Sequence, residues 1–216
     1  MQQAIGLSPR ELYFLGGILK ARYIDYVYIS AMGDVQKHFQ AHRRQALRTL
    51  TEKNLLREDF SGNITLADGV EQILKPVFFG PMETTVQLYL PGQGQIRTWR
   101  LHQLEQAITL VEMADDEISL QIAGERQLER LIRTLLPQTK AQGPIRPLDK
   151  MYVRRVVTVR QARVGAPAHE EIWIEQDGIM YRDDHKETTP LMLTADAFAQ
   201  QMLMTMKGER EWEATK

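Results

Sequence analysis

The sequence of 216 residues contains no cysteine. This absence excludes disulfide bonds, thiol nucleophiles and zinc or iron–sulfur centres held by cysteine. A chain without cysteine fits the reducing cytoplasm, and it also occurs among secreted proteins. The absence of cysteine therefore excludes several kinds of chemistry but does not decide where in the cell the protein is found.

Long apolar runs and a basic excess are also absent. No segment reaches the roughly 18 apolar residues that span a bilayer, so we expect no membrane insertion. The opening MQQAIGLSPREL has no basic stretch followed by an apolar one, so we expect no signal peptide and a cytoplasmic location. The formal net charge is −1, whereas dedicated nucleic-acid binders usually show a basic excess. Nucleic acid is therefore an unlikely partner.

Residue patterns that carry catalysis are missing too. His38 and His42 have the i, i+4 spacing of metal ligands, but no glutamate follows His38, and two surface histidines explain the pair as well. The stretch Gly92-Gln93-Gly94 lacks the spacing of a phosphate-binding loop. The acidic clusters at 115–117 and 183–184 fall where turns are expected. We therefore expect no catalytic residue, no metal and no cofactor, and a protein that is not an enzyme.

The N-terminal part reads as helical. Ser8-Pro9-Arg10-Glu11 is a capping box with proline at the first helical position. Residues 23–29 fit either a short strand or an apolar loop. Asp34 is expected to cap a second helix that runs to about residue 54. Asp68 is expected to cap a third, short helix that ends before Pro76.

Residues 43–66 carry the pattern of a winged helix. A helix with Ala46 and Leu50 on its apolar side leads through the pair at 55–56 to a tight turn at 61–63 and a strand at 64–66. Winged helices bind DNA in some proteins and serve as scaffolds in others. If this one binds DNA, the cations that would contact phosphates are Arg43, Arg44 and Arg48.

From about residue 83 the period of the apolar residues changes from 3.6 to 2, which indicates strands. Two stretches of strands followed by a helix lie on either side of a proline-rich segment, and we interpret them as a weak internal repeat. Such halves can pair edge to edge into one sheet, which removes two exposed edges. Strands are expected at 83–90, 96–101, 107–113, 117–123, 152–164, 170–175 and 178–182, and helices at 125–136 and from Thr194 or Asp196 onward.

These patterns predict an α+β fold. A winged-helix-like helical part is followed by a duplicated antiparallel sheet of quasi-two-fold symmetry with flanking helices. The expected divisions are 1–80 for the helical part, 81–136 for the first half, 137–149 for a linker and 150–216 for the second half. Residues 81–216 are expected to share one continuous sheet.

The predicted hairpin at 91–95 is the best candidate for a binding site. It is polar and rich in glycine, with an aromatic residue in each flanking strand, and this composition suits a protein-docking loop. An ordinary mobile hairpin would read the same way. The candidate interface residues are Tyr89, Gly92, Gln93, Gly94 and Trp99.

The order of these elements resembles the EspG family, the cytosolic chaperones of type VII secretion, and the related EsaE-type proteins of Firmicutes. The resemblance covers nearly the whole chain. It is carried by LSPRELYFLGGIL, ALRTLTEKNLL, VEQILKPV, METTVQLYLPG, ERQLERLIRTLLP, EEIWIEQDGIMYRDD and TADAFAQQMLMTM. Each of these is a pattern of apolar residues and turns.

The resemblance implies a non-catalytic cytosolic chaperone with a mixed α/β fold. Such a chaperone binds a helical secreted client of the WXG, LXG or PE/PPE type, keeps it soluble and helps deliver it to the secretion ATPase. Contacts from the sheet face and an early hairpin would correspond to about Gln87–Trp99 here. The alternative is a winged-helix transcription regulator whose α/β part senses a ligand or dimerises, with Arg43, Arg44 and Arg48 on DNA.

Overall fold

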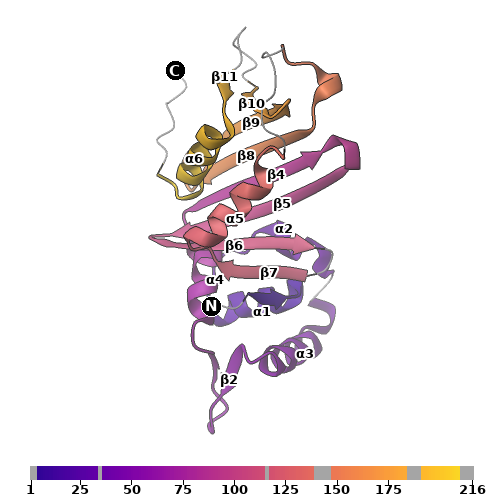
Figure 1. The fold of residues 1–216 in the computed structure, drawn as a ribbon. Coiled ribbons are helices and arrows are strands. Elements are labelled where there is room, and N and C mark those ends of the chain that lie inside the picture. The colour runs from indigo at the N-terminus through magenta and orange to yellow at the C-terminus, as the bar shows by residue number, and fades with distance from the viewer. Residues whose placement is uncertain (1–3, 34–35, 115–116, 139–146, 184–190, 210–216) are drawn as a thin grey trace. The chain divides into compact units, whose positions relative to one another are not determined.

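The computed structural model describes residues 4–33, 36–114, 117–138, 147–183 and 191–209. Within these residues the chain forms six α-helices, a nine-stranded sheet and a two-stranded sheet. They are distributed over two compact units (Figure 1). Unit 1 comprises residues 1–80 and 102–122, and unit 2 comprises residues 81–101 and 123–216.

Unit 1 contains most of the helices and three strands of the large sheet. Its helices are α1 (Pro9–Ile18), α2 (Tyr26–Ile29), α3 (Phe39–Glu52) and α4 (Val70–Phe79), with 3-10 turns at Ser30–Met32 and Gln36–His38. Its strands are β1 (Ile5–Leu7), β2 (Leu56–Glu58), β3 (Ile64–Leu66), β6 (Ala107–Ala114) and β7 (Glu117–Ile122).

Unit 2 contains the remaining strands and two helices. Its strands are β4 (Met82–Leu90), most of β5 (Gln95–Leu104), β8 (Arg155–Arg163), β9 (His169–Gln176), β10 (Ile179–Arg182) and β11 (Leu191–Leu193). Its helices are α5 (Glu125–Leu135) and α6 (Ala195–Met206), with 3-10 turns at Pro91–Gln93 and Lys150–Tyr152.

The strand order of the large sheet repeats one plan twice. The order is β1-β7-β6-β5-β4-β8-β9-β10-β11. Strands β4 to β7 follow one another and lead into α5, and strands β8 to β11 do the same and lead into α6. The first strands of the two series, β4 and β8, pair antiparallel with Val86 opposite Val159. The expected α+β class, with an antiparallel sheet and flanking helices, is thus confirmed.

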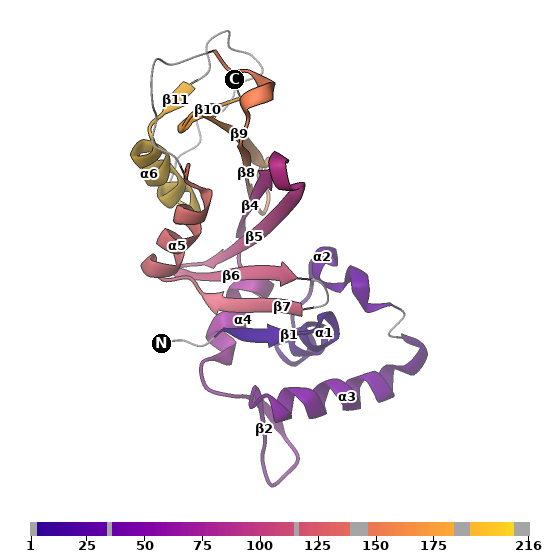
Figure 2. The same cartoon turned by 45° about the vertical axis from the view of Figure 1, so that its right-hand side comes forward.

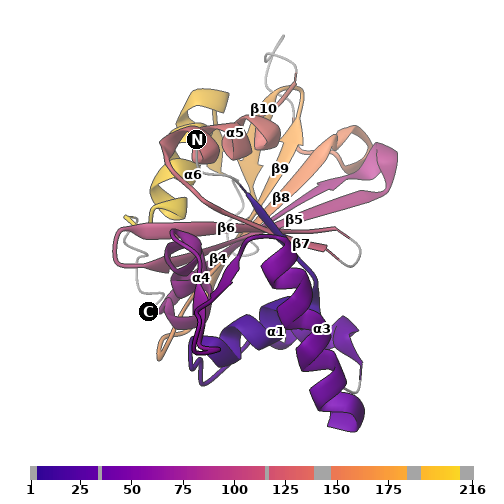
Figure 3. The same cartoon turned by 90° about the horizontal axis from the view of Figure 1, so that it is seen from below.

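The start of α1 follows from its capping box. The Ser8 hydroxyl accepts a hydrogen bond from the Glu11 N–H at 3.2 Å, and the Ser8 N–H donates to Glu11 Oε2 at 2.7 Å. Leu12 and Leu15 then fall on one side of the helix and are fully buried. In Figure 3, α3 passes across α1, against which it packs.

Three local expectations for unit 1 need correction. Residues 26–29 form a short helix rather than a strand, because the Asp25 carboxylate accepts a hydrogen bond from the Val27 N–H and caps it. Helix α4 starts from Gly69, whose φ of 81° is left-handed, and not from Asp68. It also continues through Pro76 to Phe79. Asp34, the expected cap of the second helix, lies outside the described residues, and α3 begins at Phe39.

Helix α4 is held by a contact with a distant part of the chain. Pro76 lacks the N–H that a helix needs there. The neighbouring Ile73 carbonyl accepts a hydrogen bond from the buried Thr109 hydroxyl at 2.7 Å, and Thr109 comes from β6, against which α4 packs. This contact anchors α4 in the turn before the proline, and it cannot be read from the local sequence.

The turn predicted at 61–63 is present between β2 and β3. Strands β2 and β3 pair antiparallel, with Leu56 opposite Leu66. The Asp59 carboxylate accepts hydrogen bonds from the N–H groups of Ser61 and Asn63 and so closes the turn. Gly62 supplies the left-handed backbone with a φ of 79°.

A buried ion pair holds α5 against the sheet in unit 2. Arg155 of β8 lies opposite Glu175 of β9, and both side chains are buried. The Arg155 guanidinium also donates to the carbonyls of Thr134, Leu135 and Leu136 at the C-terminal end of α5. One cation thus donates to the free carbonyls at the helix end, and its charge interacts favourably with the negative end of the helix dipole.

Strand boundaries in unit 2 differ at two places. Strand β8 begins at Arg155 and not at residue 152, because Asp149 caps a 3-10 turn through the Met151 N–H. Strand β11 was not expected, and neither was β1 in unit 1. Both have three residues, too few for a period-2 pattern to stand out.

Candidate functional site

The strands of unit 2 have one face that its helices cover. In Figures 1 and 2, α5 and α6 lie on the same side of β4, β8 and β9. Side chains that alternate toward this side form the core of the unit. They include Val86, Leu88, Val157, Val159 and Trp173, all 3% exposed or less. The Trp173 ring packs edge-on against Phe198 of α6, with ring centroids 5.3 Å apart.

The opposite face carries a row of apolar side chains across four strands. Tyr89 of β4 lies opposite Val156 of β8, which lies opposite Ile174 of β9, which lies opposite Tyr181 of β10. Tyr89 is 39% exposed, and Val156 and Ile174 are half-buried. Since directly opposite side chains on one face contact each other, this row forms a continuous apolar strip. We call it the open-face row.

A second, more polar row runs beside the first. Gln87 lies opposite Thr158, and Thr158 lies opposite Ile172. Gln87 is exposed, and the other two side chains are half-buried. An apolar strip edged by hydrogen-bonding groups is the composition of a protein interface with a desolvated centre and a wetter rim.

The far end of the row, at Tyr181, is a buried phenol. Burial raises the pKa of the Tyr181 hydroxyl above its ordinary value, and the nearby Asp177 carboxylate raises it further. The phenol therefore stays uncharged at neutral pH. At 2% exposure, Tyr181 closes the far end of the strip and leaves its accessible part to Tyr89, Val156 and Ile174.

The β4–β5 hairpin extends from the same strip. Pro91–Gln93 form a 3-10 turn, and Gly94 follows with a left-handed φ of 61°. Gly92, Gln93 and Gly94 are all exposed, and a side chain at Gly92 or Gly94 would meet no atom within 4 Å. Ile96, at the start of β5, is 66% exposed. The loop thus presents backbone and one aliphatic anchor to solvent.

An ion pair fixes the base of the hairpin. The Arg100 guanidinium donates to Glu83 Oε1 at 2.7 Å, and the Thr85 hydroxyl donates to the same oxygen at 2.8 Å. Glu83 and Thr85 alternate with the core residues of β4 and lie on the open face. Arg100 is therefore on the open face as well.

This geometry separates the two aromatic residues that the sequence suggested as a pair. Because neighbours in a strand point to opposite faces, Trp99 lies on the face away from Arg100. Trp99 is only 7% exposed, whereas Tyr89 is 39% exposed. Trp99 therefore supports the hairpin from the core side, and Tyr89 is the aromatic side chain available on the open face. The sequence did not single out Val156, Ile174 or Ile96, although the register of β8 with β4 could have suggested the first.

The basic residues suggested for DNA binding lie on α3 in unit 1. Arg43, Arg44 and Arg48 are all exposed. Arg48 forms an ion pair with Glu52 at 2.8 Å, and Arg44 donates to the Gln40 carbonyl. The rings of His38 and His42 have centroids 6.3 Å apart. Among the described residues, no group of three or more metal-ligating side chains comes together.

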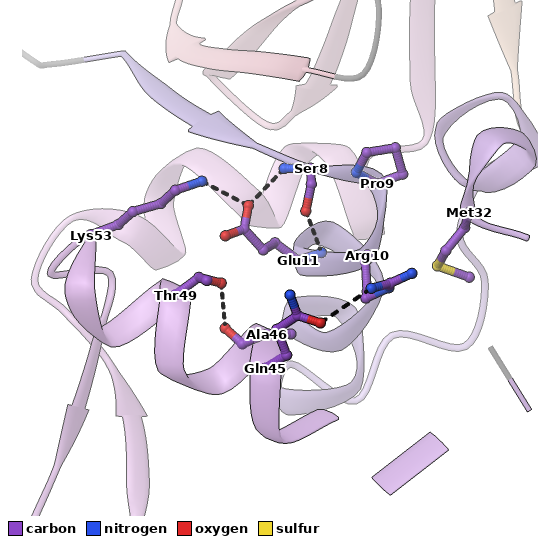
Figure 4. Close-up of a pocket in the computed structure, with 9 residues that line it drawn as sticks. All are labelled: Ser8, Pro9, Arg10, Glu11, Met32, Gln45, Ala46, Thr49 and Lys53. Atoms are coloured by element: carbon purple, nitrogen blue, oxygen red, sulfur yellow. Dashed lines mark hydrogen bonds and ion pairs between the residues drawn. The ribbon is translucent and has the colours of Figure 1, made fainter. Parts of the chain in front are cut away.

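A cavity of about 470 Å³ lies between α1 and α3 (Figure 4). Its charged centre is Glu11, which accepts hydrogen bonds from Lys53 Nζ at 2.8 Å and from the Ser8 N–H at 2.7 Å. Burial alone would raise the Glu11 pKa. The hydrogen bonds from Lys53, Ser8 and Thr49 and the lysine charge outweigh this and lower the pKa below its ordinary value. Lys53 Nζ also donates to the Gly6 carbonyl at 3.0 Å, so the ion pair ties α3 to β1.

No helix in the described part of the chain is long and apolar enough to cross a bilayer.

Comparison with known proteins gives a match in structure and none in sequence. No family model matches the chain, and no curated protein matches it. A solved structure that does match is that of the Mycobacterium tuberculosis type VII secretion system chaperone EspG5 in complex with a PE25–PPE41 dimer. The TM-score is 0.59 and the identity is 10%, and the match covers 99% of this chain and 100% of the other. The chain therefore has the fold of EspG5, which confirms at the level of the fold the resemblance to the EspG family.

Proposed function

We propose that this protein is a non-catalytic cytosolic chaperone of a type VII secretion system. It binds helical substrate proteins, keeps them soluble and delivers them to the export machinery. The observation that carries the proposal is the match of the fold to EspG5 over 99% of the chain, in a structure that contains a PE25–PPE41 dimer. The proposed client is accordingly a helical protein of the PE/PPE, WXG or LXG type, and the secretion ATPase is a proposed further partner.

The proposed client surface is the open-face row together with the β4–β5 hairpin. Its apolar strip can cover the apolar tip of a helical client, which suppresses the self-association of that client. Tyr89 and Ile96 supply exposed anchors, and the glycines at 92 and 94 let the loop adapt to the client.

The test is co-expression with the helical secreted protein whose gene lies nearest. A stable complex of the two chains is expected on size-exclusion chromatography. Tyr89→Glu and Ile96→Glu should each weaken it at least tenfold, because a charge would be buried in the interface. The matched control is Val164→Glu, which makes the same kind of change at a side chain 79% exposed beyond the end of β8. If the complex survives both test variants, the proposed surface is wrong.

The alternative function, a winged-helix regulator, makes a separate prediction. The β2–β3 hairpin next to α3 and the exposed Arg43 and Arg44 are the features that favour it. It predicts DNA binding that weakens steeply with salt and is lost when Arg43, Arg44 and Arg48 are replaced. Absence of any gel shift with genomic DNA at low salt would exclude it.

A further inference from the structure

Unit 1 has a groove, lined by both apolar and polar atoms, that the proposed client surface does not include. It has a volume of about 620 Å³ and lies between α1 with its following loop, α3 and the β2–β3 hairpin. Its residues are mostly apolar or without a side chain. They include Phe14, Gly17, Ile18, Ile24, Phe39 and Leu47.

Three aromatic residues of this groove pack edge-on and tilted against one another and form an aromatic wall. The rings of Phe14 and Phe39 lie with centroids 5.4 Å apart, and those of Tyr13 and Phe14 are also 5.4 Å apart, edge to face. Phe14 is buried, whereas Phe39 remains 39% exposed. An aromatic ring that is packed on one side and open on the other is a typical anchor point for a partner.

A glycine leaves open space on the α1 side of the groove. Gly17 lines it, and a Cβ at this position would meet no atom within 4 Å. At the preceding position, Gly16, a Cβ would lie 2.8 Å from Ile24 Cδ1 and 3.1 Å from Phe78 Cε1. The two glycines therefore differ: Gly16 allows close packing inside the unit, and Gly17 leaves space on the groove side of α1.

The charges around the groove are unequal. Arg43 lines it, and Lys20 and Arg22 flank the lining residue Ala21. Over the described residues, none of these three cations forms an ion pair, whereas Arg48, Lys53, Arg57 and Lys75 of the same unit do. Two acids near the groove are already engaged: the Asp59 carboxylate is bound within the hairpin turn, and the Asp25 carboxylate, next to the lining residue Ile24, caps α2.

We propose that this groove binds an amphipathic helix of a second protein, with an apolar face in the groove and acidic residues along its flank. The apolar lining matches the i, i+3, i+4, i+7 anchors of such a helix. The cations match acidic residues, which would also set the direction in which the helix lies. A DNA backbone would leave the aromatic wall without a partner, so a protein helix is the better occupant. The site goes beyond the client surface in unit 2 and does not depend on it.

The test is a selection from displayed helical peptides of about 16 residues against the full chain. All peptides share one apolar face, and each flanking position is drawn equally from Glu, Lys and Gln. Enrichment of Glu at the flanks, by at least about tenfold in affinity over the Lys counterpart, is expected. Arg43→Glu should reverse this preference toward Lys.

Gly17 provides a pair of matched variants for the same selection. Gly17→Leu should fill the groove and abolish peptide binding, whereas Gly17→Ala should retain it, and neither should lower the melting temperature because the added atoms enter open space. This peptide binding is independent of the proposed client function: Tyr89→Glu, which should weaken client binding, should leave peptide binding unchanged. No enrichment, enrichment of Lys, undiminished binding by Gly17→Leu, or displacement of the selected peptide by a DNA duplex would each overturn the proposal.

Discussion

Replacing Arg155 by methionine should destabilise the protein strongly. Arg155 is 5% exposed and Glu175 is 1% exposed, so the substitution leaves a carboxylate buried without its cation. Breaking a buried pair in this way costs about 3–5 kcal/mol. The substitution also frees the carbonyls at the end of α5 that the guanidinium binds. Methionine keeps the apolar stem, so the loss reports on the charge and its hydrogen bonds.

The assay is urea unfolding followed by tryptophan fluorescence. Trp99 and Trp173 are both buried in unit 2 and report on it. For a chain of this length the expected loss corresponds to a fall in melting temperature of roughly 6–20 °C. The control is Arg160→Met on the same strand, where the side chain is exposed and the cost should stay within about 0.5 kcal/mol.

A double variant measures the interaction energy between Arg155 and Glu175 separately from their other contacts. Arg155→Met with Glu175→Gln should cost less than the sum of the single changes, by about 0.5–3 kcal/mol, because the two side chains interact directly. Arg155→Lys should restore only part of the stability, since an ammonium cannot bind several carbonyls and a carboxylate in the geometry of a guanidinium. If Arg155→Met costs no more than Arg160→Met, the account of how α5 is held is refuted.

Three further results are expected. Glu11→Gln should cost about 1.5–3 kcal/mol of stability at neutral pH, because it weakens charged hydrogen bonds. Since folding lowers the Glu11 pKa below its ordinary 4.5, this difference in stability from wild type should be full above pH 4.5 and disappear as the pH falls through the folded-state pKa. A difference that persists at low pH in denaturant titrations would contradict this. Gly80→Ala should destabilise the protein by at least about 2 kcal/mol, because the added Cβ would lie 2.3 Å from the Pro76 carbonyl oxygen and 2.6 Å from the Gln103 carbonyl oxygen. Gly92→Ala, whose Cβ would meet no atom within 4 Å, should not destabilise it. Equal melting temperatures of the two variants would show that the close contact at Gly80 is absent. Trp99→Ala should cost about 3–5 kcal/mol and Tyr89→Ala less than about 1 kcal/mol, as judged by urea unfolding, and the reverse order would mean that the two aromatic residues had been assigned to the wrong faces.

The sequence predicted those elements whose signals are local. The capping box at Ser8 and the turn around Gly62 rely on hydrogen bonds within a few residues, and both appear in the structure; of the two caps expected for α6, Thr194 or Asp196, the structure has Thr194. The core positions of α6 at Phe198, Met202 and Met206 follow from helical spacing and are buried. Long periodic strands were placed to within a few residues for the same reason.

Features that depend on distant partners could not be predicted. Helix α4 is anchored by Thr109 of β6, whose hydroxyl binds the Ile73 carbonyl, and β1 forms by pairing with β7. The open-face row needs the register of four strands, which no single segment contains. Tyr89 was found from the hairpin alone, whereas Val156 and Ile174 become visible only when the strands are aligned. The expected division of the chain at 80, 136 and 149 remains a prediction.

The central claim is that this chain binds a helical secreted client through the open-face row. The most direct test is the molar mass of the complex, measured by light scattering during size-exclusion chromatography. The sample is the full chain co-expressed with the PE/PPE-, WXG- or LXG-type protein encoded nearest to its gene. A complex with equal amounts of the chain and its client, lost in Tyr89→Glu and kept in Val164→Glu, is the predicted result. Separate elution of the two proteins at the masses of the free chains would contradict the claim.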